Sequence, residues 1–587
     1  MAQELTRSEP PRPIIGKGSP NFAAFAPKVS ATPIEQVDAR VEALARRKDE
    51  WVRTPIERRL QLLRRCIERT LDVSEEWVRA ACRAKGLDPS EPRAGEEWLA
   101  GPMTTIRNLR MLVEALERGG EPPPRRTYQR EGGQWVAEVF PANTWDSLMF
   151  GGFSAEVWVE PGKAPTQGRI YREKRRNAGA YAPGKVALVL GAGNVASIGP
   201  MDALYKLFVE DEVVIVKTNP VNAYLQPYWE ESFRPLIDEG VYAVVRGGAE
   251  VGEHLVHHPL VDTIHMTGSD RTHDAIVWGA DPEEQARRKA TGERLVDKPI
   301  SSELGAVTPV FVVPGPWSDA DLWFQARHVG GMVANNGSFN CNAAKVLVTA
   351  DRWPQRAVFL DNVERVLSET APRNAYYPGA QARYDGFLER YAQAKPLSPR
   401  SSTVVPWTII PDVPAEKGEH ALTSEAFCGV LAQITLKASD PRAFLEAMVE
   451  VANDVCWGTL SCMVLVHPET QKAYAAELDR AIGALRYGGI GINVWAGVIY
   501  GLVSPTWGAF PGHPLEDIQS GRGVVHNAFL FDHPQKSVVR APFRIRPTPA
   551  WFPDHKSLHQ LAPALTRFEA GPSLLKLAPV LAAAMRG

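Results

Sequence analysis

Apolar and polar positions follow two distinct patterns along the chain. Between residues 33 and 117, apolar side chains recur every three to four positions among charged ones, as in the segment Ile56–Ile67. This period is that of an amphipathic helix, so the N-terminal part is expected to be helical. From about residue 185 onward, short runs of β-branched and other apolar residues alternate with helical segments.

These short runs predict buried strands of a mostly parallel sheet with helices on its faces, the arrangement of nucleotide-binding domains. The runs lie at residues 185–190, 213–216, 242–246 and 261–265. A second α/β series follows from Pro309 to about Asn493. Residues 125–178 indicate an extended ribbon with a basic run at Arg172–Arg176, which is expected to be a solvated face or a subunit contact.

Composition and charge exclude several classes of protein. With 587 residues, 44% of them hydrophobic and 23% charged, the chain is expected to form two or three globular domains. Its net charge of −2 gives no attraction to nucleic acid or anionic membranes. The six cysteines lack the spacing of a disulfide framework or a zinc site. No signal region or membrane-spanning run is present, so a cytoplasmic protein without metal is expected.

Cys341 and Glu303 are the first candidates for chemistry. Cys341 lies in a polar segment rich in Gly and Asn, and Glu303 stands among small residues 38 positions earlier. A thiol and a carboxylate on separate segments can act as nucleophile and base. The alternatives are a buried core thiol and a salt-bridged carboxylate.

The segment Gly191–Ala196 follows a predicted strand and fits the pattern G-x-G-x-x-A. In an ordinary Rossmann unit the next strand ends in an acidic residue that binds the ribose hydroxyls. Here that strand ends in Lys217. The ordinary dinucleotide fingerprint therefore fails at its most informative position.

A series of segments resembles the aldehyde dehydrogenase superfamily, in the same order, over roughly residues 35 to 527. No single segment is specific for this family, but the complete series in this order is. The matching segments are Ala182–Asn194, Val213–Lys217, Gly247–Gly252, His258–Asp262, Met266–Ser269, Glu303–Gly305, Cys341, Ser424–Phe427, Ala452–Gly458, Gly491–Asn493 and Ser520–Gly523.

The resemblance implies an α/β fold of the aldehyde dehydrogenase type, with a Rossmann-type cofactor domain, an α/β catalytic domain and a β-ribbon for oligomerisation. It also implies a homodimer or homotetramer. The expected boundaries are 1–35 for an N-terminal arm, 36–124 and 179–300 for the NAD(P)-binding domain, 301–495 for the catalytic domain, 125–178 and 496–530 for the ribbon, and 531–587 for a C-terminal extension.

The implied reaction is oxidation of an aldehyde to a carboxylic acid through a thiohemiacetal and a thioester, with NAD or NADP as cofactor. Cys341 would be the nucleophile, Glu303 the general base, and the Asn194 amide a donor to the oxyanion. The implied cofactor-binding residues are Lys217, Gly248, Thr267, Gly268, Ser269, Glu425 and Phe427. Two alternatives remain open: an acyl-CoA reductase that forms an aldehyde, and a cofactor-binding scaffold without turnover.

The chain departs from the family pattern near the expected site. Phe339 replaces the usual Gln before Cys341, and Cys428 follows Phe427 where Gly is usual. Pro220, three positions after Lys217, replaces an acid often found in forms that prefer NAD, which leaves NADP open.

Two further features need an interpretation of their own. The apolar C-terminal extension is expected to contact a neighbouring subunit, with a substrate entrance or a membrane surface as alternatives. The neighbours His254, His257 and His258 are better explained by a helix that ends before Pro259 than by a metal.

Overall fold

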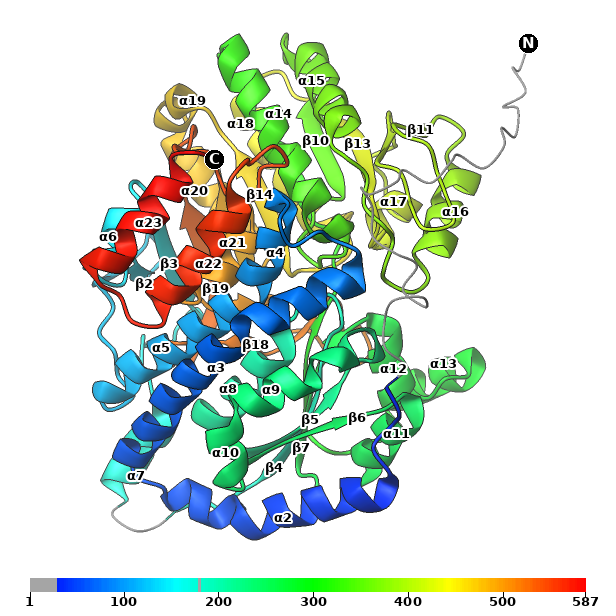
Figure 1. Cartoon of the computed structure of the whole chain (residues 1–587). Coiled ribbons are helices and arrows are strands. Elements are labelled where there is room, and N and C mark those ends of the chain that lie inside the picture. The colour runs from blue at the N-terminus through cyan, green and yellow to red at the C-terminus, as the bar shows by residue number, and fades with distance from the viewer. Residues whose placement is uncertain (1–28, 178–180) are drawn as a thin grey trace.

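The computed structural model describes residues 29–177 and 181–587 (Figure 1). Most of the expected N-terminal arm lies outside these residues. The described chain begins with two long helices, α2 (Ile34–Arg53) and α3 (Ile56–Lys85), which confirms the helical pattern. α3 ends at Gly86, whose left-handed φ of 64° allows the Leu87 N–H to reach the carbonyl of Cys82. The helical region continues with η1 (Pro92–Ala94), α4 (Gly95–Trp98), the π-helical turn η2 (Leu99–Met103) and α5 (Thr104–Glu117).

The first of two α/β units is built on a six-stranded sheet, with the strand order β17-β8-β7-β4-β5-β6. All neighbours except β17 and β8 are parallel. The strands are β4 (Val186–Leu190), β5 (Val213–Thr218), β6 (Tyr242–Arg246), β7 (Thr263–Gly268), β8 (Ile300–Leu304) and β17 (Gly521–Arg522). The four runs that the sequence predicted are β4 to β7, so the parallel α/β class is confirmed. Its helices include α8 (Ile198–Phe208), η3 (Pro220–Leu225), α9 (Gln226–Ser232), α10 (Arg234–Asp238), α11 (Ala249–His257), α12 (Asp270–Trp278) and α13 (Pro282–Thr291).

The second α/β unit is built on an eleven-stranded sheet, with the strand order β1-β2-β3-β19-β15-β14-β9-β10-β13-β12-β11. Its parallel part contains β9 (Pro309–Val312), β10 (Val346–Ala350), β12 (Thr408–Ile410), β13 (Val430–Leu436), β14 (Ser461–Leu465), β15 (Gly489–Ile492) and β19 (Pro534–Arg540). Its antiparallel edges are β1 (Arg126–Gln129), β2 (Trp135–Phe140), β3 (Ser154–Val159) and β11 (Lys395–Pro396). Its helices include α14 (Asp319–Ala334), α15 (Arg356–Glu369), α16 (Ala380–Arg390), α17 (His420–Thr423), α18 (Pro441–Asp454), α19 (Pro468–Ala473), α20 (Ala475–Ala484) and α21 (Gly497–Leu502).

The structure differs from the expected ribbon in two ways. Residues 125–178 contain β1, β2 and β3, but also α6 (Thr144–Met149) and α7 (Arg169–Arg176), so the basic run is helical. Of the second expected part, residues 496–530, β17 pairs with β8, and β16 (Trp507–Gly508) pairs with β18 (Val524–His526). β3 pairs instead with β19, which belongs to the expected extension. Strand pairing between distant segments leaves no local sequence pattern, which explains the difference.

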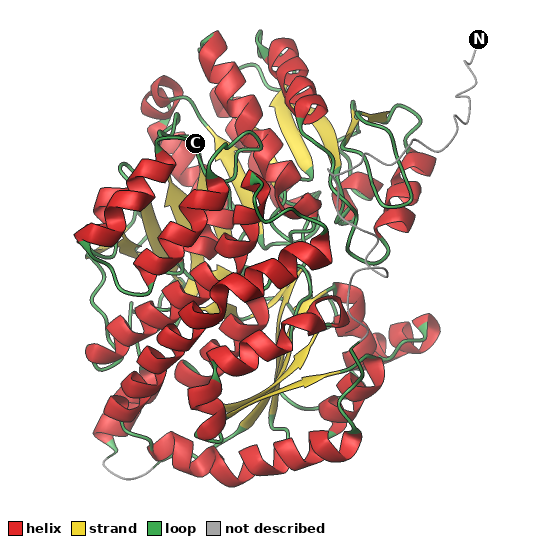
Figure 2. Ribbon diagram, viewed as in Figure 1, coloured by secondary structure: helices red, strands yellow, loops and turns green. Residues whose placement is uncertain are grey.

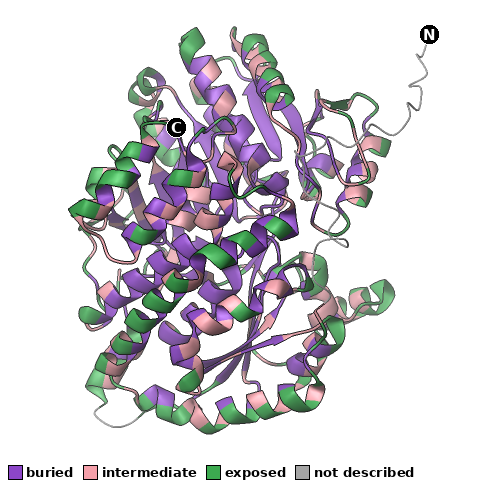
Figure 3. Ribbon diagram, in the orientation of Figure 1, coloured by how far each residue is buried: buried purple, intermediate pink, exposed green. Residues whose placement is uncertain are grey.

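The two sheets meet end to end across a cleft. The carboxyl ends of β4, β5, β7 and β8 point toward it, and the chain passes directly from β8 into β9. Figure 2 shows helices on the faces of both sheets, and Figure 3 shows that the central strands are buried. Each sheet has its own apolar core, so the loops at the cleft are held by two rigid bodies.

The C-terminal helix α22 (Leu558–Glu569) packs against α4, η2 and α5 of its own chain, and α23 (Leu574–Ala584) packs on α22 (Figure 1). Glu569 is buried and forms ion pairs with Arg107 at 2.7 Å and Arg110 at 2.5 Å. Leu574 and Leu575 on the outer side of α23 are 71% and 89% exposed. Within the described residues, no helix combines the length and the apolar character needed to cross a membrane.

The buried ion pairs of Glu569 predict that the extension contributes to stability. Glu569→Gln leaves two buried guanidinium groups short of one negative charge, which should lower the free energy of unfolding by about 3–5 kcal/mol. Glu114→Gln is the matched control, because Glu114 pairs with the same Arg110 from a partly exposed position, and its loss should cost less than about 1 kcal/mol. Urea denaturation of both variants measures the difference, and equal midpoints would contradict the prediction.

Candidate active site

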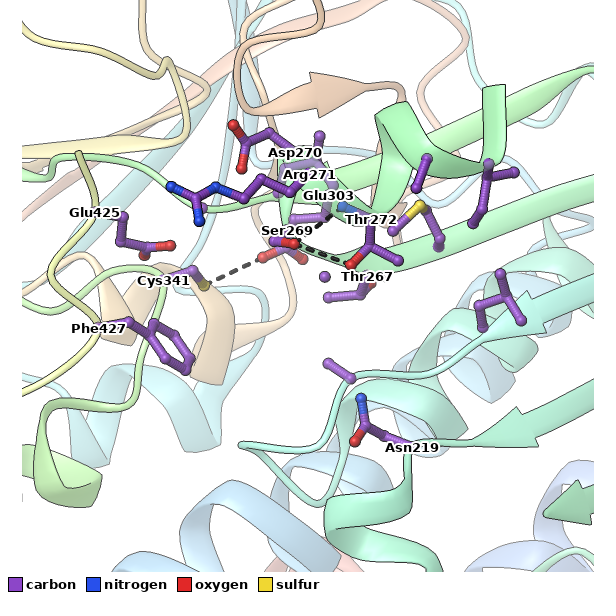
Figure 4. A pocket seen from close by; sticks show the side chains of 18 of the residues that line it. Asn219, Thr267, Ser269, Asp270, Arg271, Thr272, Glu303, Cys341, Glu425 and Phe427 are labelled. Atoms are coloured by element: carbon purple, nitrogen blue, oxygen red, sulfur yellow. Dashed lines mark hydrogen bonds between the residues drawn. The ribbon is translucent and has the colours of Figure 1, made fainter. Parts of the chain in front are cut away.

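A cavity of about 1080 Å³ lies in the cleft between the two sheets. All ten residues that the sequence singled out line it, and several of them are shown in Figure 4. The lining residues predicted from the sequence are Asn194, Lys217, Gly248, Thr267, Gly268, Ser269, Glu303, Cys341, Glu425 and Phe427. They come from segments as far apart as residues 194 and 427, so only the fold could bring them together.

Cys341 and Glu303 are in direct contact. The Cys341 thiol donates a hydrogen bond to Oε1 of Glu303, with a distance of 3.2 Å between sulfur and oxygen (Figure 4). Glu303 lies near the end of β8, and Cys341 lies between η4 (Asn335–Ser338) and β10. Asn336, Gly337 and Ser338 all have positive φ, which explains why this segment is rich in Asn and Gly.

Burial controls the protonation of this pair. Burial raises the pKa of the Cys341 thiol well above its usual value, the charges of Glu303 and Glu425 raise it further, and Lys345 opposes them. Burial also raises the pKa of Glu303 to about 7, and the nearby charge of Asp202 adds to the shift. The thiol is therefore protonated at neutral pH, and Glu303 changes its charge close to neutrality.

Asn194 lies in the loop between β4 and α8 and is buried beside the nucleophile segment. Its side-chain Nδ2 donates a hydrogen bond to the carbonyl oxygen of Phe339, at 2.8 Å. A side-chain amide nitrogen carries two hydrogens, so one N–H remains for a ligand in the cavity. Asn194 is thereby oriented by a residue only two positions before Cys341.

The far end of the cavity has the features of a dinucleotide site. Lys217 is the penultimate residue of β5, and burial lowers its pKa to about 8, without a carboxylate partner among the described residues that would raise it. Gly248 precedes α11, and a Cβ atom at this position would meet no atom within 4 Å. Ser269 caps α12 by accepting the N–H of Thr272. Two helix N-termini thus open onto the cavity, where their N–H groups favour phosphate.

Three predicted residues make contacts that the sequence did not indicate. The hydroxyl of Thr267 donates to Asp202, at 2.9 Å. The carboxylate of Glu425 forms an ion pair with Lys345 at 3.1 Å, instead of projecting freely into the cavity. Phe427 has a left-handed φ of 41° and packs edge-to-face with Tyr377, with ring centroids 5.0 Å apart.

Asp202 and Lys345 belong to the site but were missed by the sequence reasoning. Asp202 is buried on α8, and it touches Thr267, the register neighbour of Glu303 across β7 and β8. Lys345 stands four residues after Cys341, and its ammonium also donates to the carbonyls of Asn340 and Cys341. No motif marks either position, because a lone charged residue in a helix or loop usually indicates a solvated surface.

Of the three neighbouring histidines His254, His257 and His258, only two lie together in the structure. α11 ends at His257, directly before His258 and Pro259, as expected. His254 and His258 face Asp38 of α2, and Nε2 of His254 lies 2.6 Å from the Asp38 carboxylate. His257 is separate from this group and lines the cavity.

Known proteins with similar sequences and folds include several aldehyde dehydrogenases. A family model described as the aldehyde dehydrogenase family matches residues 207–376. A vanillin dehydrogenase of Corynebacterium glutamicum is 25% identical over 467 residues, which cover 76% of this chain and 75% of the relative. The solved structure of an indole-3-acetaldehyde dehydrogenase complexed with NAD+ is similar, with a TM-score of 0.57, 18% identity, and coverage of 87% of this chain and 90% of the other. A glyceraldehyde-3-phosphate dehydrogenase from Methanocaldococcus jannaschii complexed with NADP also has a TM-score of 0.57, with 14% identity and coverage of 91% and 100%.

The contact between Cys341 and Glu303 predicts the reactivity of the thiol. Cys341 is partly exposed and the other five cysteines are buried, so iodoacetamide should alkylate Cys341 first. Glu303→Gln removes a charge that raises the thiol's pKa, and alkylation should therefore become faster at a given pH. Mass spectrometry of the modified peptide measures the rate, with Cys341→Ser as the control. A rate that is unchanged or slower in Glu303→Gln would show that the carboxylate does not hold the thiol in its protonated form.

Proposed function

Since the chain belongs to the aldehyde dehydrogenase superfamily, we propose that its NAD(P)-dependent oxidation of an aldehyde runs through a thioester on Cys341. The observation that carries this proposal is the 3.2 Å hydrogen bond from the Cys341 thiol to Glu303. A nucleophile and a base in contact, beside the Asn194 amide, form the set that acyl transfer through a thiol requires.

In the first half of the reaction, Cys341 releases its thiol proton to solvent and its sulfur adds to the carbonyl carbon of the aldehyde. The carbonyl oxygen becomes an alkoxide, which needs donors placed where the charge develops. The free N–H of the Asn194 amide and a backbone N–H near Cys341 supply them. A nicotinamide dinucleotide held by residues such as Lys217 and Ser269 would supply the acceptor for the hydride that leaves this carbon, and loss of the hydride leaves Cys341 with a thioester.

In the second half, Glu303 accepts a proton from water as the water oxygen attacks the thioester carbon. The carbon–sulfur bond breaks, the carboxylic acid is released, and the Cys341 thiolate recovers a proton. A base is most effective when its pKa lies near the working pH, and the value of about 7 for Glu303 meets this condition. A relative that passes the acyl group to coenzyme A needs no such base, so Glu303 favours hydrolysis.

The dinucleotide would occupy the end of the cavity lined by Lys217, Gly248 and Ser269. Lys217 would contact the adenosine ribose, and the N-termini of α11 and α12 would face the phosphates. Pro220, at the position where an acid often repels a 2′-phosphate, is exposed and uncharged. This end of the cavity therefore allows NADP as well as NAD.

We further propose that the protein is a homo-oligomer, as the resemblance implies. The edge strand β1 is largely exposed, and its outer side is unpaired among the described residues, which suits a contact with a second copy. Light scattering of the purified chain measures its mass.

The first test of this function is reduced-nicotinamide absorbance with a panel of aliphatic and aromatic aldehydes, using NAD and NADP separately. Cys341→Ala should lower turnover by about 10³-fold or more, because the nucleophile is lost. Cofactor affinity should be unchanged, since Lys217 and Gly248 lie at the far end of the cavity. A Cys341→Ala protein with wild-type activity would contradict the mechanism, and reduction of acyl-CoA in place of aldehyde oxidation would transfer the assignment to a reductase.

The second test separates the two halves of the reaction. Glu303→Gln at alkaline pH should give one burst of reduced cofactor per site and then stall at the thioester, because the base for hydrolysis is missing. In the wild type, only ionised Glu303 can accept the proton, so the steady-state rate should rise with pH through about 7 and then level off. Stopped-flow absorbance and a pH profile measure both effects. A steady-state rate that Glu303→Gln leaves unchanged would remove Glu303 from this role.

A further inference from the structure

The backbone carbonyl of Asn194 accepts hydrogen bonds from three buried side chains. The donors are Nζ of Lys85 at 3.2 Å, Nδ2 of Asn336 at 3.0 Å and the hydroxyl of Tyr376 at 3.0 Å. A carbonyl oxygen has two lone pairs, so three donors exceed its usual number of partners. The residue whose side chain is expected to stabilise the oxyanion is therefore fixed through its main chain as well.

Lys85 is at the centre of this arrangement. It is the last residue of α3 and is only 4% exposed. Its ammonium also contacts Oε1 of Glu97 and Oδ1 of Asn336, both at 2.9 Å, so all three of its hydrogens have acceptors. Lys85 thus joins two N-terminal helices to the loop that carries Asn194 and to the loop that carries Cys341.

Asn336 connects the loop that carries Cys341 to the same hydrogen-bond network. Nδ2 of Asn336 donates to Oδ1 of Asn340, at 3.0 Å, and to the carbonyl of Phe339, at 3.3 Å. The Phe339 carbonyl is also the acceptor that orients the Asn194 amide. The hydroxyl of Tyr376 closes the network, because its single O–H is shared between the Asn194 carbonyl and Oδ1 of Asn336, which lies 2.9 Å from the hydroxyl oxygen. The oxyanion donor and the residues before the nucleophile are therefore parts of one hydrogen-bonded unit.

We propose that Lys85 is a positioning residue for the oxidation, which places the Asn194 amide and the Cys341 thiol so that both act on one carbonyl group. This inference rests on the proposed function of those two residues. Lys85 acts through Asn194 and Asn336. Burying an ammonium and a carboxylate together gives little net stability compared with an apolar pair, so the pair of Lys85 and Glu97 is better explained by the geometry that it imposes.

The C-terminal extension keeps the partner of Lys85 in place. Glu97 is 2% exposed and lies on α4, a helix of only four residues. α22 of the extension covers this helix so closely that a Cβ atom at Gly95 would lie 2.5 Å from the backbone oxygen of Leu558. The extension therefore acts within its own chain, on the helix that holds Glu97.

The test compares Lys85→Met with Lys536→Met. Lys536 is an equally buried lysine whose ammonium donates to the carbonyls of Ile482, Gly483 and Leu485, and it lies on β19, outside the active-site cavity. Lys85→Met should lower kcat by about 10²-fold, as expected for a small misplacement of catalytic groups, with unchanged cofactor affinity. Lys536→Met should leave kcat per folded molecule unchanged. A wild-type kcat in Lys85→Met, or an equal loss in both variants, would overturn the proposal.

Tyr376→Phe provides a second variant that removes one donor and keeps the ring in place, so it applies even if Lys85→Met fails to fold. It should lower kcat less than Lys85→Met does. The two losses should combine to less than their product, because both residues act on the Asn194 carbonyl. Unchanged kcat in Tyr376→Phe, or fully independent effects, would contradict a shared role. The proposed function fails separately, through a wild type that does not oxidise aldehydes or does so without Cys341.

Discussion

The contact between the partly exposed Cys341 thiol and the buried Glu303 carboxyl is the interaction on which the site depends. It exists because β8 ends at the cleft and continues into β9 of the other sheet, while the loop before β10 reaches the same point. Burial disfavours the charged form of each group, so the pKa of the thiol and the pKa of the carboxyl both lie above those of solvated groups. The resting protein thereby protects its nucleophile, and Lys345 limits how far the thiol is stabilised in its protonated form.

Polar groups buried around this pair are joined into networks that connect separate parts of the chain. Lys85 and Glu97 join the N-terminal helices to both catalytic loops, and Glu96 pairs with Arg373 next to them. Glu569 joins the C-terminal extension to Arg107, which also pairs with Asp146. A buried charge without its partner is costly, so each network admits one relative placement of its elements. The precision of the site is therefore a property of the whole chain.

The parallel strands were predicted from local patterns, because buried strands leave a signature within a few positions. The ten candidate site residues were predicted from the ordered segments that resemble the aldehyde dehydrogenase superfamily, such as Met266–Ser269. Contacts between positions that are distant in the sequence leave no such signature. Lys85 and Asn336 are 251 residues apart, and the pairing of Glu425 with Lys345 depends on how two loops meet. The helical conformation of the basic run in α7 and the pairing of β3 with β19 were not predicted, since tertiary context decides both.

The place of β19 in the eleven-stranded sheet has a consequence for the making of the protein. β19 is formed by residues 534–540, near the end of the chain, yet it fills the position between β3 and β15 in the interior of the sheet. During synthesis, β3 is complete long before β19 leaves the ribosome, and β15, which ends at residue 492, is complete shortly before it. Two open, apolar sheet edges thus exist on every nascent chain, and such edges pair readily with other chains. Successful expression of this protein depends on how long those edges remain unpaired, and thus on translation speed and chaperone supply.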